Sequence, residues 1–273
     1  MTRCVGHRGG GALAPENTLA AFRAGIAAGS DAVECDVHCT REGQLVLMHD
    51  ADVSRTTDGS GSIGSMSLAE LQRLNCAAQF GDGAFAPQRI VTLDELLALA
   101  RGRCAVQIEI KVPQGVPYAG IEARVVDALH EHGALDTAEV ISFDPDTLQR
   151  VRALESHLAL GLLAARSSLP TSLLSDPAGL ADLALACGAG FLSLDRQFIL
   201  PQHRQATRER GLGLAVWTVN DPAEMKRFVK EGADAITSDR PDILRHVLEE
   251  QGRQAVSRPQ ASAKVRDGQY QDR

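Results

Sequence analysis

The chain has 273 residues, of which 44% are hydrophobic and 23% are charged, and its formal net charge is -7. This length and composition suit one large globular domain with a sizeable core and exclude a small scaffold that depends on disulfides. The negative charge does not favour nucleic acid or anionic lipid as a partner.

Short apolar runs alternate with amphipathic segments of helix length along most of the chain. The first strand is expected over 3–7, the first helix over 17–29, and the second strand over 32–37 with an extension over 45–49. A helix over 92–100 begins at the capping box of Thr92 and Glu95. Later strands are expected over 105–111, 139–142, 158–163, 190–195, 212–219 and 234–237, and helices over 120–133, from 145, near 178–187, over 201–210, and from 222 and 241.

This alternation predicts the architecture. Strands that are separated by helices form a parallel sheet, and eight strand–helix units in one domain of this size predict a closed (β/α)8 TIM barrel over residues 1–250. Residues 51–91 depart from the rhythm, because they are rich in Gly and Ser and hold one short helix capped by Ser67 and Glu70. They indicate a small insertion after the second strand. Residues 251–273 are polar and predict a disordered tail.

Two further features bear on location. Residues 1–10 contain no apolar signal region, and no stretch approaches eighteen apolar residues. The six cysteines are scattered without a C-x-x-C spacing, and several lie in apolar runs where a thiol packs as a small hydrophobic group. We therefore expect a cytoplasmic protein with reduced cysteines and no stable membrane association.

The stretch HRGGGALA after the first strand allows two interpretations. Gly9, Gly11 and Ala14 match the G-x-G-x-x-A fingerprint of a dinucleotide-binding turn. However, Pro15 biases the preceding residue away from helix, so the helix begins too late for that turn. We instead expect the glycines to let the backbone pass close to a substrate and to leave room for His7 and Arg8.

Charged residues recur near the ends of the predicted strands. Because side chains alternate faces along a strand, Glu34 and Asp36 share one face, as do Glu109 and Lys111. In a barrel these faces point to the axis, near the C-terminal mouth where such enzymes work. Three confined carboxylates need a counter-charge. Their oxygen donors favour a divalent cation, Mg2+ or Ca2+, over zinc.

The other residues of this mouth suit phosphate chemistry. Arg8 and Lys111 add positive charge beside the acids, which suits a phosphate whose bond is breaking. His7 ends the first strand and His49 ends the extension of the second, which provides one general base and one general acid. Trp217 lies late in the seventh strand and is a candidate for lining the substrate pocket.

Each of these residues also has a structural interpretation. Lys111 could neutralise Glu109, Arg8 could be an internal ion-pair partner, and Trp217 could be packing. A rival catalytic interpretation is an aldolase barrel in which Lys111 forms a Schiff base. Asp195 and Asp239 lie at strand or loop ends and need no chemical role. The histidines expected to be surface or hydrogen-bonded residues are His38, His130, His132, His157, His203 and His246.

Several motifs resemble one known family, the glycerophosphodiester phosphodiesterases, in the same order along the chain. The last of these motifs, T-S-D-R-P-D (237–242), is one residue longer than the T-D-x-P that is usual in the family, so no role is expected for Asp239. The motifs are H-R-G-x(5)-P-E-N-T (7–18), E-C-D-V (34–37), V-L-M-H-D (46–50), R-T-T-D-G-S-G (55–61), I-E-I-K (108–111), S-F-D (142–144), V-W-T-V-N (216–220) and T-S-D-R-P-D (237–242).

The resemblance implies a TIM barrel with a small insertion and the hydrolysis of a small-molecule glycerophosphodiester to glycerol 3-phosphate and an alcohol. Two alternatives stay open, namely a phosphodiesterase of the same fold that cleaves lysophospholipids, and a non-catalytic barrel that binds headgroups. The roles implied by the resemblance are metal ligation by Glu34, Asp36 and Glu109, acid–base catalysis by His7 and His49, phosphate contact by Arg8 and Lys111, and a pocket wall at Trp217.

Overall fold

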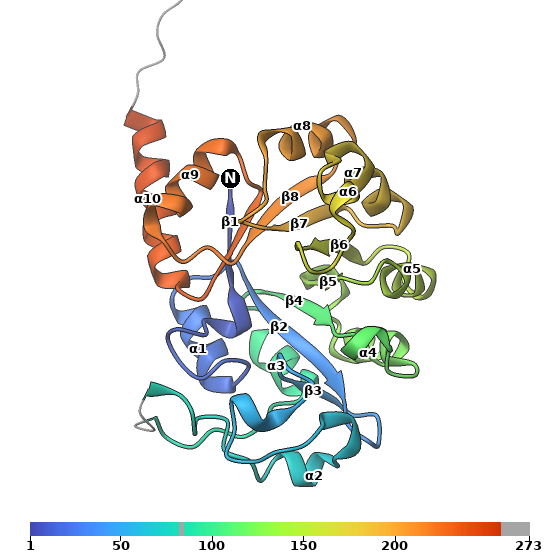
Figure 1. Cartoon of the computed structure of the whole chain (residues 1–273). Coiled ribbons are helices and arrows are strands. Elements are labelled where there is room, and N and C mark those ends of the chain that lie inside the picture. Colours follow the sequence, from blue (N-terminus) through green and yellow to red (C-terminus); the bar gives the residue numbers. More distant parts are fainter. Residues whose placement is uncertain (82–84, 258–273) are drawn as a thin grey trace, which may run out of the picture.

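The computed structural model describes residues 1–81 and 85–257 and contains a closed barrel of eight parallel strands surrounded by helices (Figure 1). The first strand pairs with both the second and the last, which closes the barrel. The predicted TIM barrel is therefore confirmed. The barrel strands are β1 (Arg3–Gly6), β2 (Ala32–Cys39), β4 (Ala105–Ile110), β5 (Ala138–Ser142), β6 (Ala159–Ala164), β7 (Phe191–Asp195), β8 (Gly213–Trp217) and β9 (Ala235–Ser238).

Local sequence signals set the starts of the helices. The capping boxes of Thr92 with Glu95 and of Ser67 with Glu70 are both formed. Several later helices begin with proline in the first turn, where the missing N–H has no helical partner to lose. The helices are α1 (Leu19–Ala27), α2 (Leu68–Leu71), α3 (Leu93–Ala100), α4 (Ile121–His132), α5 (Pro145–Leu154), α6 (Thr171–Leu174), α7 (Pro177–Ala186), α8 (Pro201–Glu209), α9 (Pro222–Glu231) and α10 (Pro241–Ser257).

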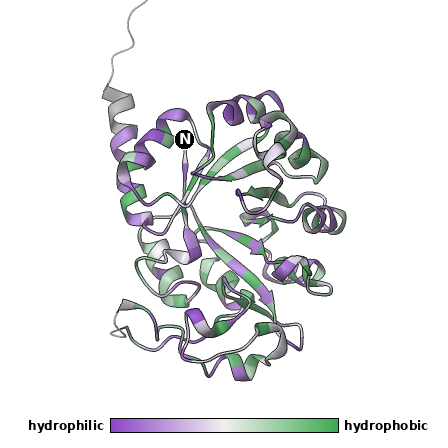
Figure 2. Ribbon diagram, viewed as in Figure 1, coloured by the Kyte–Doolittle hydropathy of each residue, from purple (hydrophilic) through white to green (hydrophobic). Residues whose placement is uncertain are grey.

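The strands present alternate residues to the helices and to the barrel interior. On β2, Val33, Cys35 and Val37 pack into the main apolar core. The residues between them, Glu34 and Asp36, are buried on the opposite face. Figure 2 shows this alternation as hydrophobic and hydrophilic bands along the strand. The barrel thus encloses acidic side chains while its outer face forms the hydrophobic core.

The extension expected over 45–49 is a separate strand, and this prediction was wrong. β3 (Leu45–Leu47) turns back and pairs antiparallel with the end of β2, with Val37 opposite Leu47. The backbone N–H of Met48 then donates to the carbonyl of Asp36 at 3.0 Å. Because His49 follows Met48 directly, this reversal returns His49 to the level of Asp36.

The insertion shares a small apolar cluster with β3 and with Met48, the residue after it. Its described residues, which include α2, lie at one edge of the molecule (Figure 1). Residues 82–84 lie outside the described range. A cluster of this kind holds the segment against β3 through burial of apolar side chains. The buried members are Val46, Met48, Val53, Ile63, Leu71, Cys76 and Ile90.

The C-terminal end differs in part from the expectation. α10 continues to Ser257, so residues 251–257 are helical rather than disordered. The rest of the expected tail, residues 258–273, lies outside the described residues. All six cysteines are free thiols, and all but the half-buried Cys104 are buried. Within the described ranges, no helix combines the length and the apolar character needed to cross a membrane.

Candidate active site

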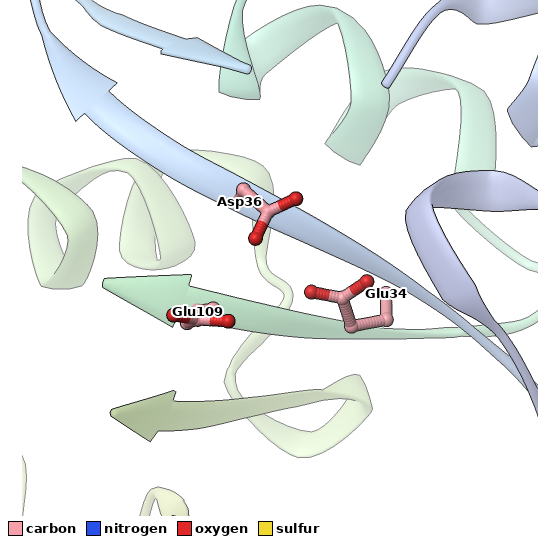
Figure 3. A group of neighbouring side chains, drawn as sticks. All are labelled: Glu34, Asp36 and Glu109. Carbon is pink, nitrogen blue, oxygen red and sulfur yellow. The ribbon is translucent and has the colours of Figure 1, made fainter. Parts of the chain in front are cut away.

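Three buried carboxylates converge inside the barrel. Glu34 and Asp36 lie two residues apart on β2, and Glu109 lies on the adjacent strand β4, directly opposite Asp36 in the parallel register. Each offers an oxygen within 4.8 Å of the others. Figure 3 shows the three side chains projecting from the two strands toward one another. The predicted convergence of these acids is therefore present.

The cluster carries more negative charge than its neighbours balance. Burial, followed by the charge of Asp36, raises the pKa of Glu34 to about 8, and burial also raises the pKa of Glu109. Burial alone would raise the pKa of Asp36 as well, but Lys111 and Arg8 hold it well below its ordinary value. A set of oxygen donors that is short of positive charge fits a hard divalent cation such as Mg2+ or Ca2+.

The two expected cations stand at the rim of this acid cluster. Lys111 Nζ lies 2.8 Å from Asp36 Oδ1 and 2.7 Å from Glu109 Oε1. Arg8 Nε lies 3.5 Å from Asp36 Oδ2, and one of its terminal nitrogens donates to Glu16 at 2.9 Å. The backbone N–H of Arg8 donates to Glu34 at 2.8 Å. Both side chains are thus ion-pair partners and pocket residues at once.

The state of Lys111 argues against an aldolase. Burial alone would lower the pKa of Lys111, but the charges of Asp36 and Glu109 outweigh it and raise the pKa. A Schiff-base lysine needs a neutral amine, which desolvation or a neighbouring cation usually provides. Lys111 is instead held in its protonated, charged form. Its position therefore favours stabilisation of negative charge over reaction as a free amine.

Two histidines line the same pocket, and each has a carboxylate on Nδ1. His7 Nδ1 lies 2.6 Å from Asp239 Oδ1, and His49 Nδ1 lies 2.6 Å from Asp50 Oδ1. Burial lowers the pKa of His7, but the bond to Asp239 and the charge of Glu34 outweigh it and the pKa is raised. Burial and the charge of Lys111 lower the pKa of His49. With Nδ1 engaged, Nε2 is the nitrogen left for proton transfer in both rings.

The pocket encloses about 160 Å³ and combines charged and apolar walls. Trp217 forms part of the apolar wall together with Ile141, Phe143 and Leu163. Its indole N–H donates to the carbonyl of Ser193 at 3.0 Å, and its ring meets Phe143 edge-on with 5.7 Å between centroids. Trp217 therefore packs against its neighbours and also lines the pocket.

Comparison with known proteins places the chain in a family. Residues 7–243 match the model of the glycerophosphoryl diester phosphodiesterase family. The chain belongs to this family. A glycerophosphodiester phosphodiesterase of Caldanaerobacter subterraneus subsp. tengcongensis is 32% identical over 255 residues, which are 92% of this chain and 99% of that protein. The resemblance seen in the motifs is thereby confirmed.

Solved structures agree with this assignment. A glycerophosphodiester phosphodiesterase from Agrobacterium tumefaciens aligns with a TM-score of 0.75 and 27% identity over 89% of this chain and 99% of that chain. An Oleispira antarctica phosphodiesterase in complex with the product sn-glycerol-3-phosphate aligns with a TM-score of 0.79 and 26% identity, covering 91% of this chain and 97% of that one. This chain is thus a phosphodiesterase-family TIM barrel.

Two residues of the family motifs, Asp50 and Asp239, contact the histidines although the sequence analysis gave them no role. Asp50 directly follows His49, so its adjacency was a usable signal. Asp239 follows the last barrel strand and contacts His7, although the lengthened T-S-D-R-P motif had suggested no role for it. Asn220, from another family motif, donates to Asp239 Oδ2 at 2.6 Å and accepts from the Asp239 backbone N–H at 2.9 Å.

One glycine of the first loop, Gly9, has a packing role that was not expected. Gly9 has φ +87°, and a Cβ there would lie 2.6 Å from the backbone nitrogen of Phe22 in α1. A Cβ on Gly25 of the same helix would lie 1.9 Å from the Gly9 carbonyl oxygen. Gly9 therefore allows the loop to pack on the helix rather than making room for a substrate. The helix itself begins at Leu19 with Thr18 as its cap, after Pro15 as predicted.

The remaining histidines lie outside the pocket lining. His38 is buried next to the site, where its Nδ1 lies 2.9 Å from the hydroxyl of Tyr118 and its Nε2 lies 3.2 Å from the backbone carbonyl of His49. Burial lowers its pKa to about 4, so it remains neutral and supports the His49 backbone. His203 is a buried residue in the first turn of α8, where its Nδ1 accepts from the Leu200 N–H at 3.0 Å.

Proposed function

We propose that the chain hydrolyses glycerophosphodiesters to sn-glycerol 3-phosphate and an alcohol. One observation carries this proposal: His7 and His49, each with a carboxylate on Nδ1, line a single pocket with the buried acids Glu34 and Glu109. Membership of the family and the name of the Caldanaerobacter relative support the substrate class. The product bound to the Oleispira structure supports the same direction of cleavage.

We assign one divalent cation, Mg2+ or Ca2+, to Glu34, Asp36 and Glu109. Their oxygen atoms lie close enough to share an ion, and oxygen donors are what these ions prefer. When bound, such an ion would stabilise the negative charge of the phosphate. Arg8 and Lys111 border the same acids, so we assign them to the phosphate oxygens, which guanidinium and ammonium groups bind well.

The two imidazoles would carry the proton transfers. One accepts the proton of the attacking hydroxyl, and the other donates a proton to the departing alcohol oxygen. Both transfers are needed whether a neighbouring glycerol hydroxyl attacks first or water attacks directly. The pKa of His7 is raised and that of His49 is lowered, and opposite environments of this kind suit an acid–base pair. Trp217 would contact the carbon atoms of the substrate.

The experiment is a panel of substrates offered to the purified protein. Glycerophosphocholine, glycerophosphoethanolamine, glycerophosphoglycerol and glycerophosphoinositol are incubated with it, and sn-glycerol 3-phosphate is quantified with an enzyme-coupled assay. We expect release from several of them, because the assigned residues contact only the shared glycerol and phosphate. Release from lysophosphatidylcholine alone would favour a lysophospholipid enzyme, and binding without any release would favour a headgroup-binding barrel. We also propose a cytoplasmic location, which fractionation of the source cells would test.

A further inference from the structure

Arg55 joins two parts of the active site that are separate in the sequence. It is the last residue of the short 3-10 helix η2 (Val53–Arg55) in the insertion. Its two terminal nitrogens donate to the carboxylate of Glu16 in the first loop, at 2.6 and 3.2 Å. Its Nε donates to Asp50 Oδ2. The other oxygen of Asp50 lies 2.6 Å from Nδ1 of His49.

The contacts continue on the other side of Glu16. Glu16 Oε1 also accepts from Arg8 at 2.9 Å, and Arg8 in turn faces Asp36 in the acid cluster. An unbroken series of charged contacts therefore runs from the acid cluster through the first loop and the insertion to His49. Its members are Asp36, Arg8, Glu16, Arg55, Asp50 and His49.

The two histidines differ in how firmly the barrel holds them. The side chain of His7 is 17% exposed, and its carboxylate partner is fixed by Asn220. The side chain of His49 is 37% exposed and that of Asp50 is 34% exposed. His7 directly follows the barrel strand β1, whereas His49 follows β3, which is not one of the barrel strands. Because Asp50 lies at the same exposed rim as His49, the orientation of the pair depends on the group that binds Asp50.

We propose that Arg55 is a positioning residue, which orients the His49–Asp50 pair and sets its place relative to Arg8. This inference rests on the proposed function and gives the insertion a role in it. A guanidinium suits the task because its fork and its Nε edge bind two carboxylates at fixed angles, which an ammonium group cannot do. Arg55 itself is 46% exposed, and exposed ion pairs contribute little to stability. Its loss should therefore affect turnover far more than folding.

The test compares Arg55→Gln with a matched control in the same insertion. Arg89 is 45% exposed and forms an ion pair with Glu95, away from the pocket. We expect Arg55→Gln to lower kcat on glycerophosphocholine by about 10- to 100-fold, as loss of the hydrogen-bond partners that orient metal-binding histidines does. Arg89→Gln should leave kcat near the wild-type value, and both variants should melt close to the wild type. Arg55→Lys should restore only part of the loss.

Double variants identify the route of the effect. If Arg55 acts through Asp50, adding Arg55→Gln to Asp50→Asn should lower kcat little further, because interacting residues are not additive. Wild-type kcat in Arg55→Gln would overturn the inference. So would a loss that is fully additive with Asp50→Asn, or equal to the loss in Arg89→Gln.

A measurement without turnover separates this inference from the proposed function. Nitrogen-15 NMR reports the tautomer and hydrogen bond of the His49 imidazole, which the missing resonances of His49→Ala identify. We expect Arg55→Gln, and not Arg89→Gln, to shift the Nδ1 signal. Absence of any product from the wild type would contradict the proposed function alone. An unchanged His49 spectrum in Arg55→Gln would contradict the positioning role whatever the substrate is.

Discussion

His7 Nδ1 lies 2.6 Å from Asp239 Oδ1 although the two residues are 232 positions apart in the chain. Closure of the barrel explains this contact. The first strand pairs in parallel with the last, and Gly6 is opposite Ser238 in that register. His7 and Asp239 are the next residue of each strand, so closure itself brings them together. The pair is thus a direct product of the fold.

Replacing Asp239 with Asn tests this pair. The neutral amide removes the negative charge that favours the Nδ1-protonated ring, so the tautomer and the imidazolium form are both less favoured. We expect kcat to fall by about 10- to 100-fold, with a smaller change in KM. Steady-state kinetics on glycerophosphocholine provide the measurement.

The control for that variant is Asp195→Asn. Asp195 ends β7, where its carboxylate accepts from the Gln197 backbone N–H at 2.8 Å, and it does not line the pocket. This substitution should leave kcat close to the wild type. Equal activities in the two variants would show that the His7–Asp239 contact has no part in turnover.

Removal of either imidazole should have a larger effect. We expect His7→Ala and His49→Ala each to lower kcat by about 100- to 10,000-fold, which is the usual contribution of general acid–base catalysis. Circular dichroism should show the same fold in both variants, since neither side chain belongs to the apolar core. Near-normal turnover in either variant would remove that histidine from the mechanism.

Lys111 should matter for folding when no divalent ion is present. Its ammonium group lies between the buried carboxylates of Asp36 and Glu109. Because Lys111→Met removes the cation that contacts Glu109 and leaves Asp36 with Arg8 alone, we expect the free energy of unfolding to fall by about 3–5 kcal/mol in urea titrations with chelator. Added Mg2+ or Ca2+ should restore part of the loss.

An exposed lysine provides the comparison. Lys226 pairs with Glu250 at the surface, at 3.1 Å, and is 49% exposed. Lys226→Met should change the unfolding free energy by at most about 1 kcal/mol, with or without the ion. A loss of similar size in both variants would mean that the acid cluster does not depend on Lys111 for its charge balance.

His203 predicts how stability depends on pH. Burial lowers its pKa below the ordinary value of 6.5. The folded state therefore binds fewer protons than the unfolded state as the pH falls below 6.5. The stabilising effect of the neutral ring is complete above that pH and declines below it, by at most about 1.4 kcal/mol per pH unit.

The substitution His203→Asn removes this titration but keeps an acceptor for the Leu200 N–H. Urea unfolding at several pH values between 8 and 5 should therefore give a flatter profile for the variant than for the wild type. Parallel profiles would show that His203 does not titrate differently in the two states.

Local patterns in the sequence were sufficient to predict the barrel strands, the main helices and the position of the acids on β2 and β4. Alternation along a strand depends only on neighbouring residues, so the shared face of Glu34 and Asp36 could be predicted. The contact of His7 with Asp239 could not, because it depends on the register between the first and last strands. The extra residue before Asp239 also disguised its motif.

The reversal at β3 and the role of Gly9 depend on packing in three dimensions. An apolar run such as 45–49 looks the same whether it continues a strand or turns back beside it, because both bury alternate residues. Likewise, a glycine that lets a loop approach a helix has the same sequence as one that makes room for a ligand. These distinctions require the partner surface to be known.

The most direct test is whether release of sn-glycerol 3-phosphate depends on a divalent ion at Glu34, Asp36 and Glu109. The protein is freed of metal with a chelator and titrated with Mg2+ or Ca2+ while product is measured from glycerophosphocholine. We predict no release before the titration, saturable recovery for the wild type, and no recovery for Glu34→Gln at the same ion concentrations. Full release in excess chelator, or equal recovery in Glu34→Gln, would contradict the metal site.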